Sequence, residues 1–194
     1  MHEMKGSAQR IALGAMIVAL SFVISLLPTL PGPITKFAGF PLLLGGMLLG
    51  PRTGFAVGCL TDLIGFAFRP TGPFFPGFTL TQGLTCMLPG LFTRLRDPFT
   101  WREPDSEVKI PRGGSVGAYL RIFGIFAVTQ GVTSVLLVSI FRSKIVAGTP
   151  LMYELNTRAL AQLTHVPVYA LMAFAILQTL SQTELYERIL KARD

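Results

Sequence analysis

Asp62 stands in an otherwise apolar stretch, "GPRTGFAVGCLTDLIG" (residues 50–65), and is the first residue whose chemistry needs an explanation. A carboxylate that faces lipid costs about 2.5–3.5 kcal/mol on insertion scales, so it is expected to face a partner or a water-filled cavity. Arg69 and Arg158 are the cations that we expect to pair with it. Asp62 therefore predicts a polar site inside an apolar protein.

A second polar pattern lies in the last apolar stretch of the chain. Arg158, Gln162, His165 and Tyr169 follow one another at i, i+4, i+7 and i+11, which places them on a single face of a helix. A guanidinium binds carboxylates and an amide both donates and accepts hydrogen bonds, so this face suits a polar ligand. The alternative is that glutamine only ties helices together and that His165 is a hydrogen-bonded packing residue.

Other segments add polar and aromatic side chains that a helical bundle would bring to the same end. The polar ones are Thr79, Thr81, Gln82, Thr133 and Ser134, and the aromatic ones are Phe74, Phe75 and Phe78. Rings beside cations suit a flat heteroaromatic ligand with an acidic tail. The alternative is that the hydroxyl groups only link helices and that the rings form an aromatic belt at the membrane interface.

Motifs for catalysis and for metal binding do not emerge from the sequence. It contains no Walker-type nucleotide loop, and no Ser or Cys nucleophile has a plausible His and acid partner. Cys59 and Cys86 lack a partner at zinc-ligand spacing. We therefore expect a protein that is not an enzyme and holds no metal, with an intramembrane enzyme built on Asp62 and His165 as a minor alternative.

The elements that must position these residues are membrane helices. Of the 194 residues, 51% are hydrophobic and only 14% are charged, against about 25% charged in ordinary globular proteins. Apolar segments lie at 11–27, 37–50, 53–68, 77–93, 117–141 and 157–180. We predict an all-α integral membrane protein: a six-transmembrane-helix bundle forming a single membrane-embedded domain over residues 1–194. Because 37–50 and 77–93 are short and contain proline, five spans is the alternative.

The basic residues predict the orientation of this bundle. With six spans, all of the 17 Lys and Arg residues lie on the side of the termini except Lys36, Arg69, Arg142, Lys144 and Arg158. Cytoplasmic loops carry the excess of Lys and Arg, so both termini are expected in the cytoplasm of a cell-membrane protein. The loop at about 94–117 is then cytoplasmic. This distribution explains the net charge of +7 by topology, without a nucleic-acid partner.

Small residues mark two helix faces. Gly50, Gly54, Gly58 and Asp62 recur at four-residue spacing, which lets another helix approach closely and turns Asp62 toward the bundle interior. Ala12, Ala15 and Ala19 form a similar face on the first helix. This second face either packs within the bundle or docks onto another membrane protein.

Three stretches together resemble the substrate-binding S components of energy-coupling factor (ECF) vitamin transporters. Residues 40–65 are similar to that family's Gly-Pro-x-x-Gly-x-x-x-Gly-x-x-x-Asp-x-x-Gly segment. "GPFFPGFTLT" (72–81) is similar to the Phe-Pro-Gly-Phe-Thr signature of the folate-specific branch, and "LNTRALAQLTHVPV" (155–168) to its Leu-x-x-Arg segment. The resemblance covers nearly the whole chain.

This resemblance implies a bundle that captures folate or a reduced folate at its outer side, with residues 28–37 closing over it. The face of Ala12, Ala15 and Ala19 would dock onto the ECF module, a transmembrane coupling protein with two ATPases. Those partners would hydrolyse ATP, so no cofactor is expected on this chain. The bundle would topple in the membrane to release its cargo inward.

The resemblance also suggests a role for each candidate binding residue. Arg158, with Arg69 or Lys36, would pair with carboxylates, while Gln82 and Gln162 would hydrogen-bond the ligand beside Thr79. Phe74 or Phe78 would stack on its rings. Asp62 would accept from the pterin N–H groups or orient an arginine. An S component for another small vitamin such as pantothenate, and a membrane scaffold, are the alternatives.

Overall fold

The computed structural model describes residues 2–26, 39–70, 72–95, 116–145 and 149–181, together with Thr183 and Ile189; side chains in the first range are described from Ala8 onward. These ranges form helices. They are α1 (His2–Leu26), α2 (Phe40–Leu49), α3 (Pro51–Phe68), α4 (Pro76–Leu95), α5 (Val116–Gln130), the π-helix η2 (Gly131–Leu137), α6 (Val138–Ile145) and α7 (Leu151–Ser181). Because α5, η2 and α6 follow one another without a break, the described residues form six helical rods. The predicted all-α bundle of six helices is confirmed.

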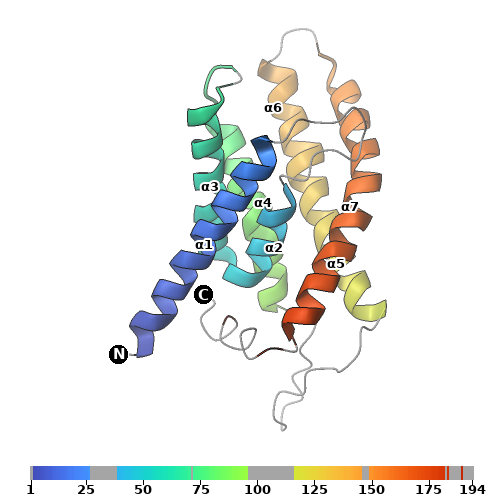
Figure 1. Cartoon of the computed structure of the whole chain (residues 1–194). Helices are drawn as coiled ribbons and strands as arrows, with labels where there is room; N and C mark the ends of the chain where they lie inside the picture. Colours follow the sequence, from blue (N-terminus) through green and yellow to red (C-terminus); the bar gives the residue numbers. More distant parts are fainter. Residues whose placement is uncertain are drawn as a thin grey trace.

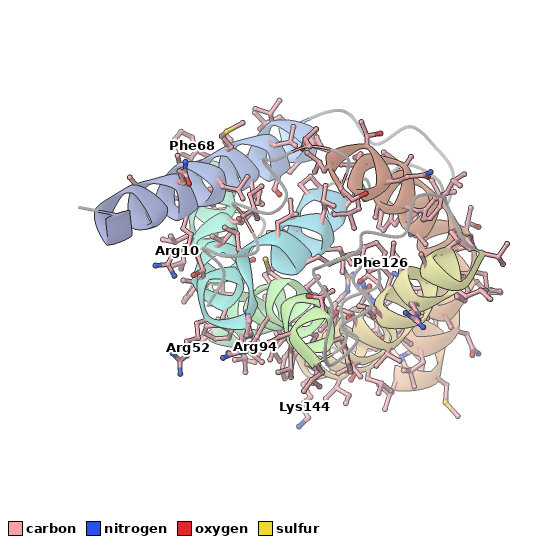
Figure 2. All side chains as sticks on the ribbon, turned by 90° about the horizontal axis from the view of Figure 1, so that it is seen from below. Arg10, Arg52, Phe68, Arg94, Phe126 and Lys144 are labelled. Atoms are coloured by element: carbon pink, nitrogen blue, oxygen red, sulfur yellow. The ribbon has the colours of Figure 1, made fainter. Side chains whose placement is uncertain are left out.

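Successive rods run in alternating directions (Figure 1). The connection from α3 to α4, the end of α6 and the start of α7 share one end, which we call the upper end. The start of α1 and the end of α7 lie at the opposite, lower end. Arg10, Arg52 and Arg94 lie on the periphery in the view from below (Figure 2); Arg52 is in the first turn of α3 and Arg94 in the last turn of α4.

Three stretches are long and apolar enough to cross a membrane: Ala8–Leu26, Val116–Ile145 and Leu151–Ser181. Large apolar side chains lie exposed along them, among them Ile11 at 70% and Leu163 at 72%. Such surface is unfavourable in water, so it is expected to face lipid tails. The chain is therefore built as a membrane protein.

Helix α2 is a half-length helix inside the bundle. Its 10 residues reach about 15 Å, half the thickness of the hydrocarbon. It is nearly enclosed, with Leu42 at 1% and Leu43 at 0% exposure. The helix ends at Gly50, whose φ of 85° is a backbone conformation that favours glycine. Pro51 then begins α3, so the chain reverses there within a residue.

The glycine face of α3 packs against α4, as the sequence predicted. A Cβ atom on Gly54 would lie 3.0 Å from the carbonyl oxygen of Cys86, and one on Gly58 would overlap the carbonyl of Gln82. Because α3 and α4 are antiparallel, the residue one turn after Gly58 in α3, which is Asp62, lies opposite Thr79 of α4. The four-residue spacing fixes which α4 residue Asp62 meets.

Replacing Gly58 with alanine is expected to lower the thermal unfolding midpoint of the detergent-purified chain by about 3–10 °C, because overpacking typically costs 1–3 kcal/mol. Gly65→Ala in the same helix is the matched control, since a Cβ there meets nothing within 4 Å. The control is expected to melt at the wild-type temperature or slightly higher. Equal midpoints for the two variants would show that α3 and α4 do not pack at Gly58.

The largest buried cluster joins α2, α5 and α7. Phe126 and Ile122 of α5 are fully buried, as are Ala170 and Ala173 of α7. Phe126 lies in the interior in the view from below (Figure 2). This core holds α7 beside the continuous rod of α5, η2 and α6, which fixes the positions of the polar residues at their upper ends.

Candidate functional site

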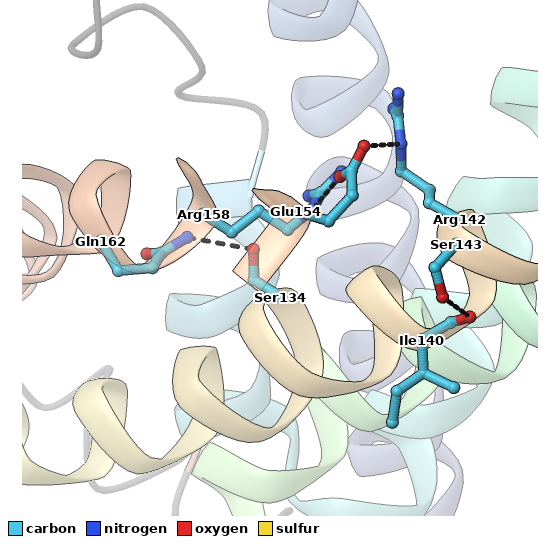
Figure 3. A network of polar contacts seen from close by, with 7 residues as sticks. All are labelled: Ser134, Ile140, Arg142, Ser143, Glu154, Arg158 and Gln162. Atoms are coloured by element: carbon cyan, nitrogen blue, oxygen red, sulfur yellow. Dashed lines mark hydrogen bonds and ion pairs between the residues drawn. The ribbon is translucent and has the colours of Figure 1, made fainter. Parts of the chain in front are cut away.

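Glu154 lies at the centre of a charged group that joins α6 to α7. Its side chain is only 10% exposed, and its Oε1 and Oε2 lie 3.3 Å and 3.2 Å from the Nε atoms of Arg142 and Arg158 (Figure 3). Glu154 is in the first turn of α7, where the helix dipole favours a negative charge, and Arg158 follows at i+4. A buried carboxylate needs such partners. We call these three residues the charge triad.

The charge triad carries one net positive charge, because two guanidiniums share one carboxylate. Both contacts are made through Nε, so the terminal nitrogens of each guanidinium lie outside them. A guanidinium offers five N–H donors in a planar fork that matches a carboxylate in bidentate geometry. The triad therefore has both the charge and the donors to bind a carboxylate of a ligand.

Gln162 lies one turn further along α7 and bridges to the π-helix. Its Nε2 donates to Oγ of Ser134, at 3.0 Å (Figure 3). Its Oε1 is buried and has no hydrogen-bond partner in the described part of the chain. A buried acceptor without a partner costs free energy, and π-helical turns often occur at functional sites. Gln162 thus presents an acceptor that suits an N–H donor of a ligand.

Asp62 has a different partner from those that the sequence suggested. Thr79 Oγ1 donates to Asp62 Oδ2 at 2.6 Å, across the α3–α4 interface. Neither Arg69 nor Arg158 pairs with it among the described residues: Arg69 Nη1 donates to the carbonyl of Ser25 at 3.3 Å, and Arg158 contacts Glu154. The expected Asp62–arginine pair is therefore wrong. The glycine register places Thr79 opposite Asp62, while Glu154 reaches Arg158 from the same helix.

Three aromatic rings pack together where the start of α4 meets α6. Phe75, Phe78 and Phe141 pack edge to face, with ring centroids 5.6 Å apart for Phe75–Phe78, 5.2 Å for Phe75–Phe141 and 6.3 Å for Phe78–Phe141. We call them the phenylalanine cluster. Phe78 directly precedes Thr79 and Phe141 directly precedes Arg142, so the same helical turns contribute to the cluster and to the two polar groups.

The other predicted site residues lie in several places. Phe74 pairs with Phe66 of α3 instead, at 5.2 Å between centroids, and Gln82 is half-buried on α4. Lys36, with the whole stretch 28–37, lies outside the described residues. His165 is buried and stacks on Tyr169, at 5.6 Å between ring centroids. Both residues in the lower half of the predicted stripe are therefore buried.

The alanine face of α1 points away from the bundle. Ala12, Ala15 and Ala19 are exposed, whereas Gly14 and Ile17 of the same helix are buried against α3 and α2. The interpretation that the alanine face packs internally is thus wrong for the described residues. The face is accessible to another protein within the membrane.

Metal binding finds no support in the described residues, where no group of three or more His, Cys, Asp or Glu side chains is arranged to hold an ion. Two surface hollows, of about 400 and 350 Å³, are lined only by residues of α7, such as Thr179 and Leu163. Neither hollow is lined by a residue of the charge triad or of the phenylalanine cluster. Glu154, Arg142 and Phe141 were not predicted from the sequence as site residues. For Glu154, its position four residues before Arg158 was a signal that could have indicated an ion pair.

Comparison with known proteins identifies the family. A family model described as "ECF transporter, substrate-specific component" matches residues 9–192, nearly the whole chain. The chain belongs to this family. The expected S component is thus confirmed, and its family is one of transporter subunits in membranes.

Two relatives bear on what this S component resembles. It is 31% identical over 80 residues to the folate transporter FolT of Clostridium novyi (strain NT); the match spans 40% of this chain and 46%, about half, of that protein. Its fold matches the crystal structure of FolT bound with folic acid, with a TM-score of 0.64 and 18% identity, over 88% of this chain and 95% of the other. The second likeness shows that the S component shares the fold of that protein.

Proposed function

We propose that this S component binds folate or a reduced folate at the upper end of the bundle and delivers it inward with an ECF module. The observation that carries the proposal is the grouping at this end of the charge triad, the phenylalanine cluster and the buried Gln162 acceptor. Folate has carboxylates at one end and a flat ring with N–H donors at the other. The likeness to two proteins named for folate supports the same ligand.

Each part of the ligand has a complementary group. Arg158 pairs with a carboxylate, Gln162 Oε1 accepts from an N–H of the ring, and Phe78 stacks on the ring face. Asp62 and Thr79 provide a second set of hydrogen-bonding groups, together with Gln82 of the same helix as Thr79. Arg69, Lys36 and Phe74 remain candidates from the sequence alone.

The orientation and the partners also belong to this proposal. The upper end faces outward and both termini face the cytoplasm, because Arg52 in the first turn of α3 and Arg94 in the last turn of α4 belong to the larger set of basic residues, which cytoplasmic loops carry. The alanine face of α1 docks onto the coupling protein of the module. Two ATPases of that module hydrolyse ATP, so the S component itself needs no cofactor.

A thermal-shift comparison of vitamins tests the ligand. Folate is expected to raise the unfolding midpoint of the purified S component, since a ligand at 100 times its Kd stabilises the folded state by about 2.7 kcal/mol. Pantothenate, which lacks a heteroaromatic ring and has a single carboxylate, is expected to leave the midpoint unchanged. A shift with pantothenate and none with folate would refute the proposed ligand.

A further inference from the structure

The charge triad contains one more arginine than its carboxylate requires. Glu154 is 8% exposed as a residue and would be neutralised by Arg158 alone, which reaches it from the next turn of α7. Arg142 comes from a different helix, α6, and is still 46% exposed on its side chain. The second guanidinium therefore adds an uncompensated positive charge at the upper end, where solvent and a ligand can reach it.

The two guanidiniums are held close together because they contact opposite oxygens of one carboxylate. Each uses Nε for this contact, which fixes the base of the planar fork and leaves its terminal nitrogens outside the contact. Two guanidiniums that share one carboxylate can each bind one of two carboxylates on a single short chain, through charge-assisted hydrogen bonds. A ligand with one carboxylate would use only one of them.

Among the described residues, Arg69 is the other predicted candidate for a second cation, and it contacts a different part of the bundle. Arg69 donates to the carbonyl of Ser25 in α1, whereas Arg142 belongs to the triad that holds Arg158. Phe141, the neighbour of Arg142, belongs to the phenylalanine cluster. Arg142 thus lies on the same turn of α6 as one ring of the phenylalanine cluster.

We propose that Arg142 is the specificity-determining residue that binds the second carboxylate of the ligand, so that the site prefers a dicarboxylate tail to a tail with one carboxylate. This inference rests on the proposed function, because it assigns the two carboxylates of the glutamate tail of folate to Arg158 and Arg142. Glu154 holds both guanidiniums in place for them.

Binding of folate and of pteroate to the purified full-length S component tests the inference. Pteroate is folate without its glutamate and has one carboxylate. The wild type is expected to prefer folate, and Arg142→Ala is expected to weaken folate binding by about 10- to 100-fold. Pteroate binding is expected to weaken less, because pteroate loses only the net positive charge of the triad and not a contact with Arg142. Lys144→Ala is the matched control, an exposed cation two residues further along α6, and is expected to change neither.

A second variant separates the second carboxylate from net charge. Arg142→Ala combined with Glu154→Gln keeps the one net positive charge of the wild-type triad. We expect it to bind folate no better than it binds pteroate, because the second guanidinium is absent while the net charge is unchanged. Equal affinity of the wild type for both ligands, or a preference for folate that both variants retain, would overturn the inference while the proposed function stands. A wild type that binds neither ligand would refute both.

Discussion

Replacement of Arg158 by alanine is expected to weaken folate binding by about 100-fold or more. Loss of a charge-assisted hydrogen bond costs about 1.5–3 kcal/mol, or roughly 10- to 150-fold in affinity. A second effect adds to it, because Glu154 then keeps Arg142 as its only partner in the charge triad. The net charge of the triad falls to zero, and its carboxylate repels the carboxylates of the ligand. Equilibrium binding of labelled folate to the purified variant measures the loss.

Arg94→Ala is the matched control for this experiment. Arg94 is an exposed arginine in the last turn of α4, at the end of the bundle opposite the charge triad. Its removal is expected to leave the affinity for folate within about twofold, and the unfolding midpoint of the ligand-free Arg158 variant reports whether that variant is folded. Wild-type affinity in a folded Arg158→Ala protein would remove Arg158 from the site.

A bulky residue on the alanine face of α1 is expected to abolish uptake without changing ligand binding. Small residues at this spacing let the backbones of two helices approach closely in lipid, and Ala15 and Ala19 are exposed on that face. Ala15→Trp together with Ala19→Trp would separate the S component from the coupling protein. Folate uptake by cells that contain the whole transporter is expected to fall at least about tenfold, and co-purification with the ECF module is expected to be lost.

Leu163→Trp on α7 provides a control of the same kind, because Leu163 is 72% exposed on another outward face. This variant is expected to take up folate and to co-purify as the wild type does. Normal uptake by the α1 variant would show that the module docks elsewhere. Loss of folate binding by the purified α1 variant would show that the substitutions disturb the bundle itself.

The sequence predicted the helices and the α3–α4 interface well because both depend on local patterns. Each predicted apolar segment overlaps one of the six rods, and the four-residue glycine spacing placed Gly54 and Gly58 against the α4 backbone. The length of α2 was less predictable, since its end depends on the positive φ at Gly50. The sequence indicated only that this segment is short for a membrane span.

The ion pairs were not predictable, because they depend on contacts between distant segments. The last helix was expected from residue 157 because Glu154 interrupts the apolar pattern, yet α7 begins at Leu151. The carboxylate is tolerated inside the helix because Arg142 of α6 and Arg158 share it. Likewise, Asp62 pairs with Thr79 and not with an arginine, which only the packing of α3 on α4 decides. The π-helix that contains Ser134 could not be predicted, because neither the composition nor the hydropathy of this segment differs from that of an α-helix.

An experimental structure of the S component with folate bound tests the central claim most directly. The bound folate is expected at the upper end, with its two carboxylates on the terminal nitrogens of Arg142 and Arg158 and its ring between Phe78 and the Oε1 atom of Gln162. Folate bound at the lower end, or bound at the upper end with its carboxylates directed away from both arginines, would contradict this account.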